Sequence, residues 1–199
     1  MKIKALLLSM IIAVSFFAAP KASYALDDYW NVSILLGSKE MDESDWEPLE
    51  SHGEFGLMTD YKGTGWPLSM AIDLYVSASD EKTFYDSSVG YFDVSVTTSE
   101  LNFGVRKHFA EDQRFRPFVG GGIGLMTVEI DTESQYGYGG DESDTALGVW
   151  LDGGFSFSVT ETFNIGLRLG YSSADVDING YEADAGGTHL GFFLGWTLL

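Results

Sequence analysis

The sequence predicts an all-β fold, an eight-stranded antiparallel up-and-down transmembrane β-barrel. Three observations lead to this prediction. Apolar residues alternate with small or polar residues over many short runs, which is the period of a strand with two different faces. The connections between these runs are long and short in strict turn. Apolar residues make up 45% of the chain, yet after Ala25 no apolar run approaches the roughly 20 residues that a membrane helix needs.

The clearest hairpin of this kind covers residues 101–130. Before a short polar turn at 110–114, large apolar residues such as Leu101 alternate with small or polar ones such as Gly104. After the turn, Ile123 and its apolar neighbours alternate with glycines in the same way. One large apolar face and one small or polar face suit a thin wall, with lipid outside and a crowded lumen inside.

The rest of the chain repeats this unit. The predicted strands cover residues 30–37, 53–61, 66–77, 92–109, 115–130, 146–158, 163–172 and 188–199. Alternation is poor between Asp93 and Ser99, which indicates either a part that stands above the membrane or a β-bulge.

The lengths of the connections favour a membrane barrel over a secreted soluble sandwich. The long connections are 39–52, 79–91, 131–145 and 173–187, and the short ones are 62–65, 110–114 and 160–161. In an outer-membrane barrel, short turns lie at the periplasmic end and long loops at the extracellular end. A soluble barrel has no reason to sort its loops in this way.

The first 25 residues have the pattern of a signal peptide. Lys2 and Lys4 precede an apolar run at 5–19 that is too short to span, and Ser23-Tyr24-Ala25 is a small-x-small cleavage site. We expect cleavage after Ala25, which leaves 26–199 as one outer-membrane barrel domain. The chain contains no Cys, which excludes a lipoprotein anchor, disulfides, thiol catalysis and thiolate metal sites.

The charge of the chain is strongly negative. Three of the 11 basic residues and none of the 30 acidic ones lie in the signal peptide, so the mature chain keeps eight basic residues and a formal charge of −22. Such a surface repels nucleic acid, which we exclude as a partner. The four long connections hold 18 of the 30 acidic residues, and their only basic residues are Lys39 and Lys82.

Several short motifs resemble one family. They are Phe103-Gly104-Val105-Arg106 leading to Arg116-Pro117-Phe118-Val119-Gly120-Gly121-Gly122, Gly166-Leu167-Arg168-Leu169-Gly170-Tyr171, and Gly191-Phe192-Phe193-Leu194-Gly195-Trp196. The mature chain resembles the small eight-stranded outer-membrane β-barrel proteins of Gram-negative bacteria, the group around OmpX and the OmpA barrel domain. The resemblance implies an outer-membrane location and a barrel-insertion machinery that reads a C-terminal aromatic residue. Here Leu199 is the last residue and Trp196 the nearest aromatic. The resemblance transfers architecture and not activity.

Six charged residues occupy positions that are predicted to face the lumen. They are Glu54, Asp73, Glu100, Arg106, Asp152 and Arg168. Asp152 and Arg168 lie at a similar height on neighbouring predicted strands, so we expect them to form a buried pair. Eight strands enclose only enough room for side chains, which favours a packed, charge-paired lumen over an ion path gated by these pairs.

A catalytic site has only three candidate histidines, His52, His108 and His189. Small barrels of the resembled type include lipid A deacylases and palmitoyltransferases. A serine hydrolase needs a nucleophile and a base within hydrogen-bond reach, and Ser172 or Ser173 could approach His189 across the last hairpin. No hydrolase motif surrounds these residues, so a polar residue at the barrel rim is the favoured interpretation of His189.

The fourth long loop contains Asp175, Asp177 and Asn179 at the first, third and fifth positions of a calcium-loop pattern. Gly186 stands where that pattern needs its bidentate glutamate. The dipeptide Asn179-Gly180 is also a type I′ hairpin signal. We favour the hairpin and keep a weak Ca²⁺ site open, since the two are compatible. No other cofactor is expected.

The sequence therefore favours a non-enzymatic outer-membrane protein with a structural or surface-interaction role. Its acidic extracellular loops would meet ions, lipopolysaccharide or a host surface, and its barrel would meet outer-membrane lipid. Two alternatives stay open. One is a lipid A-modifying enzyme with His189 as its base, and the other is a narrow pore.

Overall fold

The computed structural model describes residues 28–87, 90–134 and 139–198. The predicted signal peptide and Leu199 lie outside the described residues. Eight strands form the wall of the barrel. They are β1 (Tyr29–Glu40), β2 (Ser51–Lys62), β3 (Ser69–Ser79), β5 (Gly90–His108), β6 (Phe115–Ser134), β7 (Gly140–Ser158), β8 (Phe163–Ser173) and β11 (Gly187–Leu198). Four short elements are added to them: α2 (Glu43–Trp46), β4 (Lys82–Asp86), β9 (Asp175–Ile178) and β10 (Tyr181–Asp184).

The barrel is closed and entirely antiparallel. Each strand pairs with its neighbours in chain order, β3 pairs directly with β5, and the last strand returns to the first, with Trp30 opposite Leu198. This is the predicted eight-stranded up-and-down topology. No helix in the described part of the chain is long and apolar enough to cross a membrane.

Side chains alternate between the two faces of the wall as the sequence predicts. In β3, exposed and buried residues alternate along nearly the whole strand, so that Ile72 and Leu74 point out while Asp73 and Tyr75 point in. The outward residues of the other strands include many exposed large apolar side chains, such as Leu36, which is 64% exposed. An aqueous surface would not expose so much contiguous apolar area, whereas a lipid-facing belt does.

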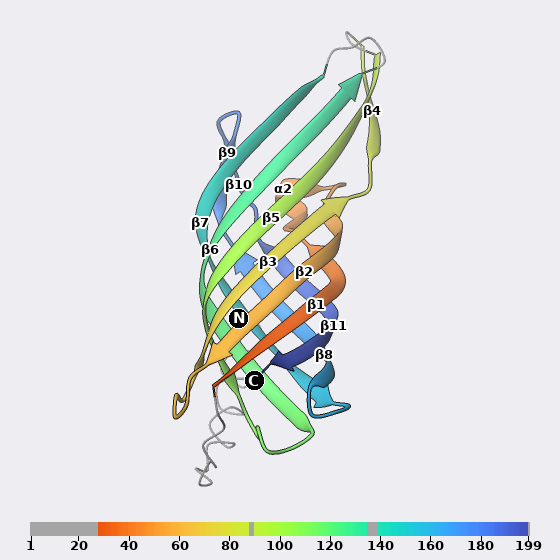
Figure 1. Cartoon of the computed structure of the whole chain (residues 1–199). Helices are drawn as coiled ribbons and strands as arrows, with labels where there is room; N and C mark the ends of the chain where they lie inside the picture. The colour runs from red at the N-terminus through yellow and green to blue at the C-terminus, as the bar shows by residue number, and fades with distance from the viewer. Residues whose placement is uncertain (1–27, 88–89, 135–138, 199) are drawn as a thin grey trace, which may run out of the picture.

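The two ends of the barrel differ. At one end lie β1's first residue, β11's last described residue and the short turns; we call this the short-turn end. At the other, the long-loop end, β5, β6 and β7 rise beyond the rest of the wall (Figure 1). These three strands have 19, 20 and 19 residues, against 11 or 12 in the other five.

The tall part of the wall corrects the predicted loops. The segment 131–145, predicted as a loop, is mostly strand, because β6 continues to Ser134 and β7 begins at Gly140. The predicted loop 79–91 contains β4, which pairs with the first residues of β5. The β5–β6 pairing is unbroken from Phe92 to His108, so the poor alternation at 93–99 marks strand above the membrane and not a bulge. We call β4 and the upper parts of β5, β6 and β7 the extension.

Candidate functional site

Three layers of side chains fill the lumen. A small polar pocket lies toward the short-turn end, a network of buried ion pairs occupies the middle, and an apolar cluster lies toward the long-loop end. Outside the lumen, the outer face of the extension also carries charged side chains, but few of them form ion pairs or hydrogen bonds with other described residues.

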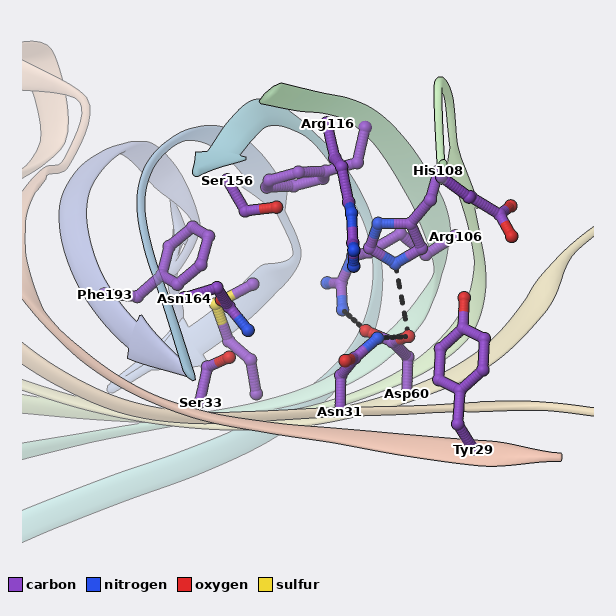
Figure 2. Close-up of a pocket in the computed structure, with 13 residues that line it drawn as sticks. Tyr29, Asn31, Ser33, Asp60, Arg106, His108, Arg116, Ser156, Asn164 and Phe193 are labelled. Atoms are coloured by element: carbon purple, nitrogen blue, oxygen red, sulfur yellow. Dashed lines mark hydrogen bonds and ion pairs between the residues drawn. The ribbon is translucent and has the colours of Figure 1, made fainter. Parts of the chain in front are cut away.

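The polar pocket is built around Asp60, and Figure 2 shows how its neighbours converge on it. The Nδ2 of Asn31 donates to one carboxylate oxygen at 3.0 Å, and the Nε2 of His108 lies 3.2 Å from the same oxygen. The other oxygen lies 3.5 Å from the Nη1 of Arg106, which also lines this pocket. Arg116 reaches the pocket from β6. Asp60 thus connects the pocket to the ion pairs above it.

Arg106 is the centre of the lower ion pairs. Its side chain is 1% exposed, and its Nη2 lies 2.7 Å from Asp73 and 2.9 Å from Asp152. The guanidinium also lies over the rings of Phe118 and Trp150, 5.6 and 5.9 Å from their centroids. A guanidinium is always charged, so it can hold two carboxylates in a dry lumen at once.

Arg168 continues the network from Asp152. Its Nε lies 3.3 Å from the same Asp152 oxygen that Arg106 contacts, and its Nη1 lies 3.6 Å from Glu54. The guanidinium stacks over Tyr75, 4.3 Å from the ring centroid. Glycine at position 170 leaves room for this arrangement, because a Cβ there would lie 2.8 Å from the Arg168 Nη2.

The upper part of the network gathers around Glu100 and His189. The Nζ of Lys39 donates to Glu100 at 2.8 Å, to Thr98 at 3.0 Å and to the carbonyl of Ala185 at 2.7 Å. The two nitrogens of His189 point at different groups. Nδ1 contacts the carboxylate of Glu54, while Nε2 lies 2.9 Å from the Ser172 hydroxyl and 3.5 Å from Glu100.

The structure brings all six predicted lumen residues into this network, and the predicted neighbours Asp152 and Arg168 are in contact. Sequence reasoning missed the parts played by Lys39, Asp60 and His189. Lys39 lies just beyond the predicted first strand, on the same face as Ser33 and Leu35. Extending the alternation by two residues would have found it. Which carboxylate meets which base depends on reach across the lumen, and alternation alone does not contain that information.

An apolar cluster, which we call the cap, closes the lumen above this network. It joins residues of the connection 41–49 that contains α2, which we call the α2 segment, with residues of β5 and β6 and of the segment 174–185 that contains the β9–β10 hairpin. Its buried members are Met41, Trp46, Leu49, Val96, Met126, Val128, Ala174, Val176 and Ala185. The indole Nε1 of Trp46 donates to the carbonyl of Asp184 at 2.8 Å, which ties the α2 segment to the hairpin. The cap separates the ion pairs from the long-loop end.

Ser172, His189 and Glu54 have the connectivity of a serine–histidine–acid triad, which makes the predicted approach of Ser172 to His189 real. Ser173 instead donates to Asp184. However, His189 is not a rim residue, since it is 0% exposed and lies beneath the cap. The Ser172 hydroxyl is also placed to donate to Glu100, at 3.1 Å. A nucleophile for lipid A would have to reach lipid, and this one faces the packed lumen.

The predicted calcium loop folds as a hairpin. Asn179 and Gly180 both have positive φ, 53° and 84°, as a type I′ turn requires. The Oδ1 of Asp177 accepts a hydrogen bond from the Gly180 backbone, and Asn179 donates to Glu142. Asp175 lies on the same strand as Asp177 and is exposed. Among the described residues, no group of three or more His, Cys, Asp or Glu side chains is arranged to hold a metal ion.

The outer face of the extension carries five carboxylates, which we call the acidic face. Its members are Asp93, Glu129, Asp131, Glu133 and Asp141. Asp131 lies directly opposite Asp141, and Asp93 directly opposite Glu133. Asp93 accepts a hydrogen bond from Thr83 at 2.6 Å. The other four have no hydrogen bond or ion pair within the described part of the chain.

The acidic face begins directly above the lipid-facing belt. Counting up the β6–β7 pair on its outer side, Leu125 and Leu147 come first and are 46% and 70% exposed. Thr127 and Thr145 follow, with their hydroxyls 2.8 Å apart, and then Glu129. The change from leucine through threonine to carboxylate places the membrane–water boundary near the threonine pair.

Two carboxylates on the inner side of the extension behave differently, because they hold the β9–β10 hairpin. Asp144 accepts the backbone N–H of Asp177 at 2.7 Å, and Glu142 accepts the side-chain amide of Asn179. Backbone hydrogen bonds from Asp177 and Thr145 hold the pKa of the Asp144 carboxyl below its ordinary value. These inner acids have structural partners, so the acidic face is the part of the extension that is free to meet another molecule.

Comparisons with known proteins agree with the fold. The chain is similar to OprG from Pseudomonas aeruginosa (13% identity, 88% of this chain and 98% of that one, TM-score 0.56). It is also similar to a major outer membrane protein from Thermus thermophilus (11%, 87% and 100%, TM-score 0.57). A third similar structure is Ail, the attachment invasion locus protein of Yersinia pestis, in complex with the heparin analogue sucrose octasulfate (12%, 87% and 100%, TM-score 0.54).

These similarities show the fold alone, and no curated relative matches the chain. The model of the outer membrane protein beta-barrel domain matches residues 9–197, which is nearly the whole chain. With the closed barrel, its apolar belt and its filled lumen, this match shows that the chain belongs to the outer membrane protein beta-barrel domain family and resides in the outer membrane.

Proposed function

We propose that this barrel is a non-enzymatic surface protein that holds divalent cations between its acidic face and the surrounding lipopolysaccharide. One observation carries the proposal. Four carboxylates without partners among the described residues lie on the outer wall directly above the lipid belt, and Asp131 and Asp141 oppose each other there. Like charges in directly opposite positions weaken a sheet, and a divalent cation bound between them would relieve that repulsion.

The position of the acidic face favours lipopolysaccharide as the other partner. The face lies on the same side of the wall as the lipid-facing residues Leu125 and Leu147, so it points toward the neighbouring lipid headgroups and not into the lumen. Phosphate-bearing headgroups and protein carboxylates repel each other, and divalent cations relieve both at once. The same charge argues against a sulfated partner such as the heparin analogue in the Ail complex.

The buried state of the lumen supports the non-enzymatic part of the proposal. Ser172 and His189 are 1% and 0% exposed and lie under the cap, so a lipid substrate has no visible approach to them. The narrow pore, which the sequence left open as an alternative, is also disfavoured, because the cap, the ion pairs and the lower aromatic side chains Phe118 and Phe193 fill successive layers of the lumen.

Thermal unfolding in membranes of defined composition tests the proposal. The barrel would be placed in vesicles with or without lipopolysaccharide, and Tm measured with EDTA and with millimolar Mg²⁺ or Ca²⁺. A variant with Glu129→Gln, Asp131→Asn, Glu133→Gln and Asp141→Asn removes the charge of the four free acids. A control variant removes the same charge from exposed acids elsewhere: Glu47→Gln, Asp80→Asn, Glu81→Gln and Glu182→Gln.

We expect divalent cations to raise the Tm of the wild type and of the control variant, and to do so more strongly in lipopolysaccharide. The acidic-face variant should lose most of this response. If both variants lose this rise in Tm equally, the cations only screen the charge of the long-loop end as a whole and do not bind at the acidic face. If divalent cations raise Tm equally with and without lipopolysaccharide, the lipid is not a partner in cation binding. If EDTA leaves the Tm of the wild type unchanged, the proposal is wrong. In parallel, His189→Ala should leave the mass spectrum of lipid A unchanged.

A further inference from the structure

The hydrogen bonds around His189 define where protons lie in the upper lumen. The Oε1 of Glu100 is 2.8 Å from the Nζ of Lys39, which keeps this carboxylate ionised and able only to accept. The Ser172 hydroxyl therefore donates its one proton to Glu100, across 3.1 Å. With that proton used, Ser172 can only accept a hydrogen bond from the Nε2 of His189.

The other nitrogen of His189 also needs a proton. Nδ1 contacts the carboxylate of Glu54, which is an acceptor. A neutral imidazole has one N–H, and only the imidazolium has two. From this geometry we infer that His189 is an imidazolium in the folded barrel at neutral pH. Its second proton, which we call the latch, adds a hydrogen bond that holds β11 to its neighbours beneath the cap.

The count of buried charges agrees with this assignment. In the network above Asp60 there are four carboxylates and three fixed cations. The carboxylates are Glu54, Asp73, Glu100 and Asp152, and the cations are Lys39, Arg106 and Arg168. An uncompensated buried charge is strongly unfavourable. One proton on His189 makes the network neutral. Asp60 is left out of this count because it belongs to the pocket that His108 and Arg116 also line, although the Nη1 of Arg106 lies 3.5 Å from one of its oxygens.

Every wall element near His189 contributes to this latch. β2 and β5 supply Glu54 and Glu100, and β8 supplies Ser172 directly and Arg168 through Glu54. β1 supplies Lys39 through Glu100, and the ring of Tyr75 from β3 lies 6.2 Å from the imidazole centroid. Loss of the proton would leave Glu54 facing an uncharged ring and would remove one donor that joins β11 to β8 or β2. The closed lumen should therefore loosen as pH rises.

His52 is a matched internal control, since it is a second buried histidine in the same lumen. Its Nε2 lies 2.9 Å from the Leu49 carbonyl, so this nitrogen donates, while Nδ1 lies 3.2 Å from the Ser77 hydroxyl and can accept. One N–H satisfies this site, and its two hydrogen-bond partners are a carbonyl and a hydroxyl, with no carboxylate of the described residues among them. We assign His52 as neutral. The two residues differ in their partners and not in their burial.

Two measurements on the full barrel in lipid nanodiscs test the inference. The first is the ¹⁵N chemical shift of the histidine rings between pH 6 and pH 9. We expect both nitrogens of His189 to stay protonated at pH 7.5, where His52 shows one protonated and one bare nitrogen. A neutral His189 ring at that pH would overturn the inference, and this measurement needs no variant.

The second measurement is unfolding in urea over the same pH range. An unfolded chain releases an imidazole proton above roughly pH 6.5, so the latch stabilises the barrel fully below that pH and progressively less above it. One retained proton raises the unfolding equilibrium constant by up to about tenfold per pH unit. Above about pH 7.5, where the imidazoles of the unfolded chain have lost their protons, His189→Gln should reduce the slope by one proton, while His52→Gln keeps the wild-type slope. Equal slopes in the wild type and His189→Gln would contradict the latch.

Discussion

The lumen and the acidic face use the same side chains in opposite ways. Asp152 in the lumen touches two guanidinium groups, from Arg106 and Arg168, on one carboxylate oxygen. Asp131 on the extension has another carboxylate directly across the β6–β7 pair and no ion pair within the described residues. Both residues lie on the same β6–β7 hairpin, where Asp152 is paired with Gly120 and Asp131 with Asp141.

The difference shows how burial decides what a charge can do. In a dry lumen a carboxylate must be paired, because the penalty for leaving it unpaired is several kcal/mol. Above the lipid boundary, water screens like charges, so carboxylates can remain unpaired at a small cost. Charge in the lumen is consequently part of the fold, and charge on the acidic face is available for function.

The largest expected effect comes from removing the centre of the lower ion pairs. Arg106→Ala would leave Asp73 and Asp152 without their closest base, and we expect a loss of about 3–5 kcal/mol in the free energy of unfolding. Urea titration in detergent or lipid measures it. The triple variant Arg106→Met, Asp73→Asn, Asp152→Asn should recover much of the loss. A triple variant as unstable as the single one would show that packing, and not charge, makes Arg106 important.

The next largest loss of stability should come from placing a charge in the lipid-facing belt, which ends where the acidic face begins. Leu167 is an outward residue of β8 and is 43% exposed. Leu167→Arg places a charge in the hydrocarbon layer, and we expect a loss of roughly 2–4 kcal/mol in a lipid bilayer. Ser143→Arg, on the outer side of β7 opposite Glu129, should cost nothing measurable. Equal stability of the two arginine variants would mean that the boundary is misplaced.

Relief of like-charge repulsion on the acidic face should change the free energy of unfolding by a smaller amount and should stabilise the barrel. Asp131→Asn removes one member of the opposed pair with Asp141, so we expect a gain of about 0.2–1 kcal/mol at low salt in the absence of divalent cations. The gain should shrink with added salt, as screened repulsion does. Asp152→Asn in the lumen is the comparison and should destabilise the barrel at every salt concentration. A loss of stability on Asp131→Asn would reveal a partner for that residue.

The smallest expected effect is a pH dependence of the hydrogen bond between Asp144 and the β9–β10 hairpin. The pKa of the Asp144 carboxyl is lowered by the backbone N–H groups of Asp177 and Thr145. Its contribution is therefore present above the ordinary value of 3.8 and is lost as pH falls below it. Hydrogen exchange of the Asp177 amide should speed up over this acidic range. In Asp144→Asn, exchange at that amide should no longer depend on pH there beyond its intrinsic rate.

Much of this architecture is predictable because alternation reports which side of a wall a residue faces. It placed Glu54, Asp73 and Arg168 in the lumen and Leu167 in the lipid belt, as the burial pattern confirms. It failed above the membrane, where the outer side of each strand meets water and carries polar residues, while the inner side packs apolar residues such as Val96 and Val128 into the cap. The extension at 93–99 and 131–145 was for this reason predicted as mixed strand and loop. Alternation places His189 at the barrel rim and cannot show that it is covered, because the cap above it is formed by residues distant in sequence, such as Trp46 and Val128.

The tall β6–β7 hairpin also constrains how the barrel is assembled. Its strands pair without interruption from Phe115 opposite Phe157 to Thr132 opposite Gly140, so the polar upper part and the lipid-spanning part are one continuous ribbon. To reach the far side of the membrane, the carboxylates of Glu129, Asp131 and Asp141 must be carried across the hydrocarbon layer. A bare bilayer opposes that passage far more than it opposes insertion of the apolar belt. Unassisted refolding into lipid vesicles should therefore stall with this hairpin on the side of entry, and thinner or more defect-rich bilayers should release it.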